Sequence, residues 1–446
     1  MIQSVAANLK DNRVHLITYG CQMNKSDSED VINLLLDDGF EVTENIDDAG
    51  IVIFNTCTVR DKAEQRVISN IGHLAKRNKN NKNFIIGMMG CVAQRDGERI
   101  LKKVEQLSFC VGTRQFPKIP SIIKEVRSTK RKVCNLEENE EVIIEKNSIK
   151  REKPYQGWIT VTRGCSKYCS YCIVPAVRGH EVSIKPNDIE DQVKRIVDDG
   201  VTEVTLLGQI VERYGKDLST PVSLAELLTR LDKINGLKRL RFITSYPKDF
   251  TEELLYAMKE LPKVCEHLHM PIQHGNDEML KQMNRGYTRQ EYLELVKKAY
   301  EIMPNLNLLS DFICGFPGET EEQHLMSESV ISEADFQSSY VFAYSPRPGT
   351  QSDKWEDKIP EELKKERVRK LLKIQNEVSL KRNLLKIDTV DEVLVERYDE
   401  KKNNWLGRNR GNQIVVFHAE RKELVGQYLN VKIREVTNLT LIGDLV

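Results

Sequence analysis

The repeated alternation of short apolar runs with segments of helical periodicity limits the fold more than any other feature of the sequence. Residues 13–21, 50–59 and 83–92 are apolar runs that end in a cysteine or a turn, and 25–40 carries apolar residues at helical spacing after a Ser/Asp N-cap signal. Alternating strands and helices build an open, largely parallel sheet whose functional site lies at the carboxyl ends of the strands. The sequence therefore predicts an α/β domain with an open parallel sheet at the N-terminus.

The alternation resumes at about residue 157 and continues for six units. Helical patterns such as 184–200 and 288–303 separate the expected strands. These strands are expected at 158–165, 201–209, 237–245, 265–273, 305–318 and 338–349. Six units predict a curved parallel sheet, a partial (βα)6 relative of the eight-unit barrel. Polar and Gly/Pro-rich residues again cluster at the carboxyl ends of these strands, where barrel enzymes place their chemistry.

The C-terminal region changes character. The charged segment 360–386 predicts a helix that leads out of the barrel, and 387–446 consists of short alternating runs punctuated by Gly and Asn, which is typical of a small all-β barrel. Residues 128–155 switch from basic to acidic to basic and predict a linker or a strand-containing connector. We therefore expect domains at 1–127, 156–378 and 379–446, with a linker at 128–155.

Charge and hydropathy restrict the location and the partners of the chain. Lys+Arg and Asp+Glu both total 67, so the net charge of zero argues against a polyanion-binding surface along the whole chain but leaves room for local basic patches. No apolar run approaches the roughly 20 residues needed to cross a bilayer, and the N-terminus lacks the apolar core of a signal peptide. We expect a cytoplasmic protein without membrane contact, in which the 10 cysteines are metal-binding, catalytic or buried rather than disulfide-bonded.

Three cysteines at CxxxCxxC spacing follow the first expected strand of the barrel. Cys165, Cys169 and Cys172 supply three thiolates to one metal centre, and no fourth Cys or His is in register nearby. Iron–sulfur clusters usually have four thiolate ligands, so a cubane with three leaves one iron open to a substrate or cofactor. Structural zinc sites are normally closed with four ligands, usually from CxxC pairs. The pattern therefore favours an iron–sulfur cluster over zinc and over unligated structural cysteines. Arg178 closes the loop, where it either serves the site or fixes the loop through an ion pair.

The CxxxCxxC loop after the first strand of a partial barrel resembles that of the radical S-adenosylmethionine (SAM) enzymes. The resemblance implies that the open iron of a [4Fe–4S] cluster binds the amino and carboxylate groups of SAM, which is cleaved to methionine and a 5′-deoxyadenosyl radical. It also implies that Tyr171, between the last two cysteines, lies beside the adenine of SAM.

Three further cysteines each follow an expected strand of the N-terminal domain. Cys21, Cys57 and Cys91 lie in "TYGCQMNKSDSE", "FNTCTVRDKA" and "MMGCVAQR". Strand ends in such a layer can bring them to one site, although spacing alone leaves that convergence open. Cys110 and Cys134 have no partner at motif spacing, and we expect them to be structural.

The three segments resemble the signature segments of the methylthiotransferases, a branch of the radical SAM superfamily, and the resemblance extends over nearly the full length. It implies an N-terminal cysteine domain, a radical SAM barrel and a C-terminal RNA-binding TRAM barrel. It also implies that Cys21, Cys57 and Cys91 hold a second [4Fe–4S] cluster that carries the sulfur, while a second SAM supplies the methyl group.

Residues at other strand ends are candidates for contacts with SAM or substrate. These are Gly208 and Gln209 after the second strand and Arg347 after the sixth, each with an ordinary structural role as the alternative. The chain departs from the family pattern, which has Asn at 210, His at 246 and Ser at 274 and 276. It carries instead Ile210, Tyr246, His274 and Asn276.

The residues after Cys21 suggest the substrate. "GCQMN" resembles the branch that modifies N6-isopentenyladenosine (dimethylallyladenosine) beside the anticodon of tRNA. The alternatives are the branches for threonylcarbamoyladenosine of tRNA and for an aspartate of a ribosomal protein, or an RNA-binding metal protein without catalysis. The resemblance implies a tRNA anticodon stem-loop, an external electron donor and a sulfur source as partners, and we expect a monomer.

Local charge predicts where RNA binds. Residues 400–422 hold six Lys/Arg and two acidic residues, with Trp405, Phe417 and His418 between them. Basic side chains with aromatic neighbours suit phosphate contact and base stacking.

Overall fold

The computed structural model describes residues 10–58, 61–79, 81, 83–138, 150–243, 245–356, 358–420 and 423–446, without the side chains of 61–65. The described chain forms two compact units. The first contains Met1–Lys153, Arg163–Ser166 and Ile173–Val182, and the second contains Pro154–Thr162, Lys167–Cys172 and Ser183–Val446. The cysteine loop at 165–172 is therefore divided between the units.

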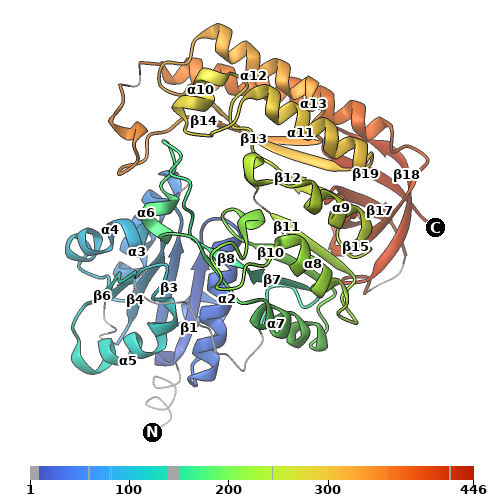
Figure 1. Ribbon diagram of the computed structural model, residues 1–446. Helices are drawn as coiled ribbons and strands as arrows, with labels where there is room; N and C mark the ends of the chain where they lie inside the picture. Colours follow the sequence, from blue (N-terminus) through green and yellow to red (C-terminus); the bar gives the residue numbers. More distant parts are fainter. Residues whose placement is uncertain are drawn as a thin grey trace. The chain divides into compact units, whose positions relative to one another are not determined.

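The first unit is built on a six-stranded parallel sheet in the order β2-β1-β3-β4-β5-β6 (Figure 1). Its strands are β1 (Arg13–Thr18), β2 (Glu41–Val42), β3 (Ile51–Thr56), β4 (Ile85–Gly90), β5 (Phe109–Val111) and β6 (Val133–Asn135). Its helices are α2 (Gln22–Asp37), α3 (Asp61–Arg77), α4 (Cys91–Lys103), α5 (Ile119–Thr129) and α6 (Val174–Arg178). The open parallel α/β fold expected at the N-terminus is confirmed, and β6 places a strand in the segment expected to be a connector, of which 139–149 lies outside the described residues.

Helices cover both faces of this sheet because successive strand residues point to opposite sides. Ile51 and Ile53 pack in one core with α2 and α5, whereas Val52 and Phe54 pack in another with α3 and α4. Strands buried on both faces appear in the sequence as continuous apolar runs, which is why they could be recognised there.

Helix α2 begins earlier than the sequence suggested. Cys21 is its N-cap residue and Gln22 its first residue, so the Ser/Asp pair interpreted as an N-cap signal lies inside the helix. Ser26 and Asp27 are 4% and 2% exposed. Their polar side chains therefore face the interior, where Asp27 pairs with Arg163 and Arg178 instead of capping the helix.

The second unit contains six parallel strands that follow each other in chain order. They form the sheets β11-β10-β7 and β12-β13-β14, and an isolated parallel bridge pairs Leu240 of β11 with Val264, three residues before β12. The strands are β7 (Gln156–Thr160), β10 (Glu203–Leu207), β11 (Arg239–Ile243), β12 (His267–His269), β13 (Asn307–Cys314) and β14 (Ser338–Ala343). The predicted partial (βα)6 barrel is confirmed.

Helices connect these strands, and most of them have a side-chain cap that matches the sequence. They are α7 (Pro186–Asp198), α8 (Leu224–Asp232), α9 (Glu252–Glu260), α10 (Asp277–Gln282), α11 (Arg289–Ile302), α12 (Glu321–Glu333) and α13 (Glu361–Leu384). Ser223, Thr288 and Thr320 form capping boxes at the starts of α8, α11 and α12. These caps fix where each strand-to-helix loop ends. Two short strands, β8 (Thr162–Arg163) and β9 (Val182–Ser183), pair beside the cysteine loop.

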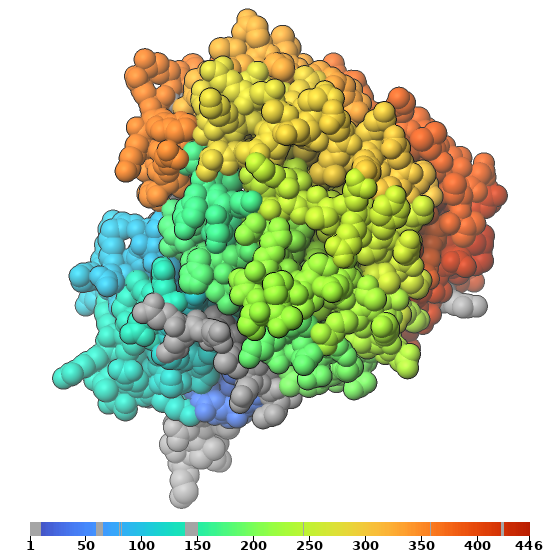
Figure 2. All heavy atoms as spheres, viewed as in Figure 1, coloured from blue at the N-terminus to red at the C-terminus, as the bar shows by residue number. Residues whose placement is uncertain are grey.

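The C-terminal segment forms a closed barrel in the order β15-β16-β17-β19-β18, as predicted. Its strands are β15 (Val390–Asp399), β16 (Asn404–Arg408), β17 (Ile414–His418), β18 (Tyr428–Val436) and β19 (Thr440–Leu445). In the space-filling view (Figure 2) this barrel, in red, lies against the yellow and green part of the same unit. Two arginines join the two parts: the buried Arg239 contacts Glu392 at 2.9 Å, and the partly buried Arg410 contacts Glu266 at 2.8 Å.

Candidate functional site

The three N-terminal cysteines lie at the carboxyl ends of neighbouring strands. Cys21 follows β1, Cys57 follows β3 and Cys91 is the first residue of α4, directly after β4. Because β1, β3 and β4 are adjacent and parallel, their ends meet at one edge of the sheet. Cys57 and Cys91 are buried, whereas Cys21 is exposed. The structure thus brings the three predicted residues to one region of the first unit.

Two glycines allow the chain to approach closely at this edge. Gly20 has a φ of +133°, and a Cβ on it would lie 2.6 Å from the Cβ of Cys57. Gly90 has a φ of +93°, and its Cβ would lie 2.5 Å from the carbonyl oxygen of Thr56. Only glycine combines this backbone with this lack of space. The residues before Cys21 and Cys91 therefore hold both cysteines near the end of β3.

Arg178 faces the N-terminal cysteines. Burial raises the pKa of the Cys91 thiol, and the charge of Arg178, which also hydrogen-bonds to this cysteine, opposes that rise. Arg178 forms an ion pair with Asp27 at 3.2 Å, and Arg163 forms one with the same carboxylate at 2.6 Å. The predicted ion-pair role of Arg178 is present, and in addition its guanidinium lies beside a thiol. A buried cation that interacts with the thiols of Cys91 and Cys21 fits an anionic thiolate-bound cluster.

In the second unit, the loop that carries Cys169 and Cys172 is held by its neighbours. The Ser170 N–H donates to the carbonyl of Met283 at 3.1 Å, and the Ser352 N–H donates to the carbonyl of Ser170 at 2.8 Å. The Cys172 N–H donates to the carbonyl of Cys169 at 2.9 Å. Arg285 donates from Nη1 to the Sγ of Cys169 at 3.4 Å.

Tyr171 belongs to an aromatic cluster around the loop after the fifth barrel strand. Its ring packs edge-on against Phe316, with centroids 6.4 Å apart, and Phe316 in turn packs against Tyr344 and Trp355. Phe316 lies in the "GFPGE" segment that follows β13, and Tyr344 follows β14. The cysteine loop is thereby tied to the carboxyl ends of the last two barrel strands.

A buried charged network supports the "GFPGE" loop. Glu319 accepts a hydrogen bond from the Gly315 N–H, one from Arg367 at 2.7 Å and one from His274 Nε2 at 2.9 Å. The Asn276 N–H donates to Nδ1 of His274 at 3.0 Å, which leaves Nε2 to face the carboxylate of Glu319. Burial alone would raise the pKa of Glu319, but its interactions with His274 and His324 and the charge of Arg367 lower it to about 2. His274, which departs from the family pattern, therefore positions the loop through this carboxylate.

The other predicted contact residues also follow barrel strands. Gly208 and Gln209 come directly after β10, and a Cβ on Gly208 would lie 2.2 Å from the Oγ1 of Thr162. Arg347 lies in the turn after β14, where its carbonyl accepts a hydrogen bond from the Thr350 N–H at 3.0 Å. The structure thus places all three at the end of the barrel where its chemistry is expected.

Buried hydroxyl groups at the same end of the barrel fit a polar ligand. The side-chain oxygens of Thr162, Ser170 and Ser245 have no hydrogen-bond partner in the described chain. They follow β7, belong to the cysteine loop and follow β11, respectively. Buried polar atoms are normally paired, and a ligand rich in donors and acceptors, as SAM is, would pair them.

The described residues contain no group of three or more His, Cys, Asp or Glu side chains arranged to hold one metal ion. A cubane cluster spreads its thiolates over three irons, so it needs a wider arrangement than a single ion. In the part of the chain that the structure covers, no helix combines the length and the apolar character needed to cross a membrane.

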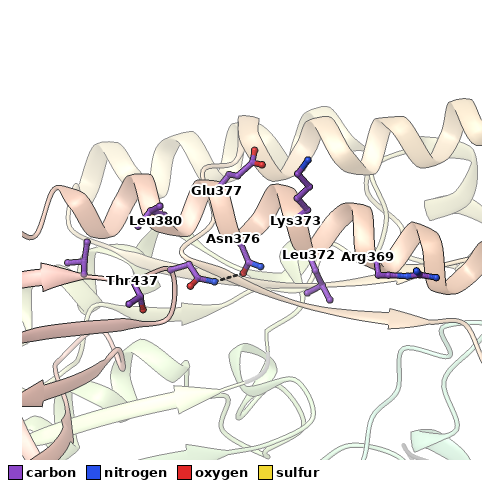
Figure 3. Close-up of a pocket in the computed structure, with 9 residues that line it drawn as sticks. Arg369, Leu372, Lys373, Asn376, Glu377, Leu380 and Thr437 are labelled. Carbon is purple, nitrogen blue, oxygen red and sulfur yellow. Dashed lines mark hydrogen bonds between the residues drawn. The ribbon is translucent and has the colours of Figure 1, made fainter.

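A groove of about 660 Å³ lies away from the cysteines, between α13 and the turn joining β18 and β19 (Figure 3). Arg369, Leu372, Lys373 and Leu380 line it from the helix, and Asn438 reaches Asn376 across it at 2.7 Å.

The predicted RNA-binding stretch of the C-terminal barrel is only partly on the surface. Trp405 and Phe417 are 5% and 1% exposed and belong to the barrel core, so the expectation that they interleave with the surface basic residues is wrong. Arg410 is engaged with Glu266 inside the unit. Lys401 and Lys402 are exposed, as is His418, while 421 and 422 lie outside the described residues.

Sequence reasoning missed several residues of the site. Asp27 and Asn24 occupy the face of α2 that is apolar further along at Val31, and such polar residues at core positions are a signal that could have been used. Arg285 and Glu319 gave no such signal, because their partners are distant in the sequence. Cys110 and Cys134, which are expected to be structural, are register partners on the neighbouring strands β5 and β6.

Comparisons with known proteins agree with this architecture. Residues 13–112 match the model of "Uncharacterized protein family UPF0004", residues 159–328 match the radical SAM superfamily and residues 388–446 match the TRAM domain. Among solved structures, radical SAM methyltransferase TsrM from Kitasatospora setae aligns with a TM-score of 0.55 at 15% identity, covering 76% of this chain and 74% of that one. At this identity the likeness concerns the fold alone.

Curated relatives resemble the chain over nearly its whole length. The tRNA-2-methylthio-N6-dimethylallyladenosine synthase of Caldicellulosiruptor saccharolyticus is 40% identical over 441 residues, which are 98% of this chain and 93% of the relative. The protein of the same name from Clostridium botulinum (strain Okra) is 41% identical over 432 residues, covering 96% of this chain and 95% of the relative.

A partial (βα)6 barrel with a three-cysteine loop after its first strand defines the class of radical SAM proteins. Two additions narrow the class: a parallel α/β domain with three strand-end cysteines and a C-terminal TRAM barrel. With its near full-length identity to the curated relatives, the chain belongs to the family of tRNA-2-methylthio-N6-dimethylallyladenosine synthases, which are radical SAM methylthiotransferases.

Proposed function

We propose that this chain adds a methylthio group to carbon 2 of N6-dimethylallyladenosine beside the anticodon of tRNA, using SAM and two [4Fe–4S] clusters. The observation that carries the proposal is its identity of about 40% to synthases of that name over almost the entire chain. Three cysteines at strand ends and three in the loop after β8 support it, because they provide two sets of three thiolates.

The two sets have different proposed roles. Cys165, Cys169 and Cys172 hold the cluster that binds SAM, and the second set, formed by Cys21, Cys57 and Cys91, holds the auxiliary cluster. When bound, these groups supply one-electron cleavage of SAM and the sulfur to be inserted. We keep 1–127, 156–378 and 379–446 as the proposed domains, with 128–155 as linker.

The chain's own residues orient the reactants. Tyr171, with Gly208, Gln209 and Arg347, is proposed to contact SAM, and the unpaired hydroxyls of Thr162 and Ser170 offer it hydrogen bonds at the same end of the barrel. Arg178 places positive charge beside the thiol of Cys91. These side chains supply positive charge and orient SAM, while the bound cofactors carry out the bond cleavage.

The proposed substrate is the anticodon stem-loop of tRNA. Single-stranded loop RNA releases a base from its stack at low cost, which allows the adenine to enter a protein site. Lys401 and Lys402 are exposed on the C-terminal barrel and are suited to phosphate contact. The proposal further includes an external electron donor, an external sulfur source, a monomeric enzyme and a cytoplasmic location.

The decisive experiment is the anaerobically reconstituted reaction on isopentenylated anticodon stem-loop RNA. We expect SAM cleavage and a methylthio product from the parent protein. The Cys21→Ala variant is expected to cleave SAM without inserting sulfur, whereas Cys134→Ala, the matched change at an exposed cysteine, should behave as the parent. Absence of SAM cleavage by fully reconstituted parent protein would support an RNA-binding iron–sulfur protein instead.

Mass spectrometry of tRNA nucleosides tests the substrate. A strain that lacks the gene should lose the 2-methylthio-isopentenyl nucleoside. If this nucleoside persists while the threonylcarbamoyl derivative or the modified ribosomal aspartate disappears, the chain belongs to the corresponding branch of activity.

A further inference from the structure

Arg285 is a buried cation next to the CxxxCxxC loop. It lies in the turn between α10 and α11 and is only 5% exposed. Its guanidinium donates from Nη1 to the Sγ of Cys169 at 3.4 Å and to the Tyr171 hydroxyl at 3.5 Å, and from Nη2 to the carbonyl of Pro271 at 3.0 Å. Two of its contacts are therefore with residues of the cysteine loop.

The charge of this guanidinium has no carboxylate partner among the described residues. Other buried arginines of the same unit do have one: Arg241 contacts Glu203 at 3.1 Å, and Arg367 contacts Glu319 at 2.7 Å. A buried charge is costly unless an opposite charge compensates it. The group in contact with Arg285 that can become anionic at neutral pH is the thiol of Cys169, once it is a metal-bound thiolate.

Two tyrosines fix the direction of the guanidinium. The Nε–H donates to the hydroxyl of Tyr287 at 2.9 Å, and the Tyr287 hydroxyl in turn donates to the carbonyl of Ile272 at 2.9 Å. Tyr246 faces the guanidinium with its ring centroid 4.5 Å from Cζ, and its hydroxyl donates to the backbone carbonyl of Arg285. The resulting geometry leaves Nη1 directed at Cys169.

We propose that Arg285 is a positioning residue that raises the reduction potential of the cluster held by Cys169, by donating an N–H to this sulfur and placing an uncompensated positive charge beside it. The inference rests on the proposed function, because it takes Cys169 to be a cluster ligand. It goes further in naming the group that makes this particular cluster easier to reduce.

The physical reason is electrostatic. Reduction adds one electron to the cluster, and a buried cation nearby stabilises the more negative form by more than it stabilises the oxidised form. Hydrogen bonds to cluster sulfurs and the burial of the site are known determinants of iron–sulfur potentials. An arginine that is neutralised by a carboxylate would have a smaller effect.

The test measures the reduced fraction of this cluster by electron paramagnetic resonance in samples poised at graded ambient potentials, without RNA. The full chain is used in a background that lacks the three N-terminal cysteines, so that one cluster is observed. Arg285→Gln is expected to lower the ratio of reduced to oxidised cluster at least tenfold at a fixed potential, which is about 59 mV for a one-electron couple. Arg285→Lys, which keeps the charge, should lower it less.

Control variants distinguish an effect on the reduction potential of the cluster from an effect on folding. Arg289→Gln changes a nearby arginine that pairs with Glu333, and it should leave the ratio unchanged. If Arg285→Gln does not hold a full cluster, the inference is tested with Tyr287→Phe instead. This variant removes the hydroxyl that orients the guanidinium, and it should lower the ratio of reduced to oxidised cluster by a smaller factor. The inference is overturned if Arg285→Gln holds a full cluster and its ratio is unchanged. If Arg285→Gln does not hold a full cluster, an unchanged ratio in Tyr287→Phe overturns the inference.

A separate variant tests the underlying assignment. Cys169→Ala in the same background should abolish the signal. If the signal persists, the proposed ligand set is wrong, and this outcome is distinct from a potential that fails to respond to Arg285.

Discussion

Gly20 is where the arrangement of the N-terminal cysteines can be tested most directly. We expect Gly20→Ala to displace the segment that carries Cys21 from Cys57 and to prevent assembly of the auxiliary cluster. The new Cβ would lie 2.6 Å from the Cβ of Cys57 and 2.8 Å from the Oδ1 of Asn24. Ordinary contacts between carbon atoms are about 3.5–4.0 Å, so one of the two segments must move by about 1 Å.

The cost has two parts. Alanine at positive φ costs about 1–2 kcal/mol, and overpacking in a closed space adds about 1–3 kcal/mol, which together give about 2–5 kcal/mol. Gly39→Ala is the matched control, because Gly39 has a φ of +85° and nothing within 4 Å of the added Cβ. That variant carries the backbone cost alone, about 1–2 kcal/mol.

Two measurements follow for each variant. Urea unfolding of the metal-free protein gives the change in the free energy of unfolding, and iron analysis after reconstitution gives the number of clusters. We expect iron in Gly20→Ala to fall from about eight to about four atoms per chain, the content of one [4Fe–4S] cluster, with SAM cleavage retained. Equal unfolding costs in the two variants, with full iron in both, would refute the reasoning.

Three further predictions concern other parts of the chain. Asp27→Asn removes the carboxylate shared by the buried Arg178 and Arg163, of which Arg163 keeps a longer pair with Asp30 at 3.8 Å. The change should lower the free energy of unfolding by about 3–5 kcal/mol in urea melts, whereas Asp38→Asn, which breaks an exposed pair, should cost at most about 1 kcal/mol. Because the pKa of Glu319 is lowered to about 2 from the ordinary 4.5, its carboxylate stabilises the fold above about pH 4.5, and this contribution, on the order of 3 kcal/mol, is lost as pH falls toward 2. The stability gap between the parent and Glu319→Gln should therefore narrow over that range, and a gap independent of pH would contradict the assigned charge. Replacing Lys401 and Lys402 by glutamate should weaken stem-loop binding and lower the slope of log K against log salt by about two if both contact phosphate, as measured by filter binding at several salt concentrations.

The fold could be predicted to a large extent because its main signals are local. Parallel strands buried on both faces, such as Ile51–Thr56 and Ile85–Gly90, are continuous apolar runs, and a cysteine after each one marks the functional edge of the sheet. The beginning of α2 was misplaced because Cys21 caps it without a side-chain hydrogen bond, so no capping residue identifies the start.

The partners within the site could not be predicted in the same way. Arg285 and Cys169 are 116 residues apart in the sequence, and Glu319 and Arg367 are 48 residues apart. Such contacts depend on the closure of the barrel rather than on any local pattern. The aromatic residues of the C-terminal barrel were a different case: Trp405 and Phe417 are register partners across β16 and β17, and their alternation with outward residues could have indicated an inward position.

The division of the cysteine loop has a consequence for how the protein is made. Arg163 and Arg178 belong to the first unit, where they neutralise Asp27, although both follow residue 153 in the chain. Ile173 and Val177 likewise pack against Cys91. During synthesis, which proceeds at roughly 5–20 residues per second, the N-terminal sheet can assemble early, but its buried carboxylate waits for these arginines. The first unit completes its fold only after residue 182 has left the ribosome, so its maturation is coupled in time to the start of the barrel.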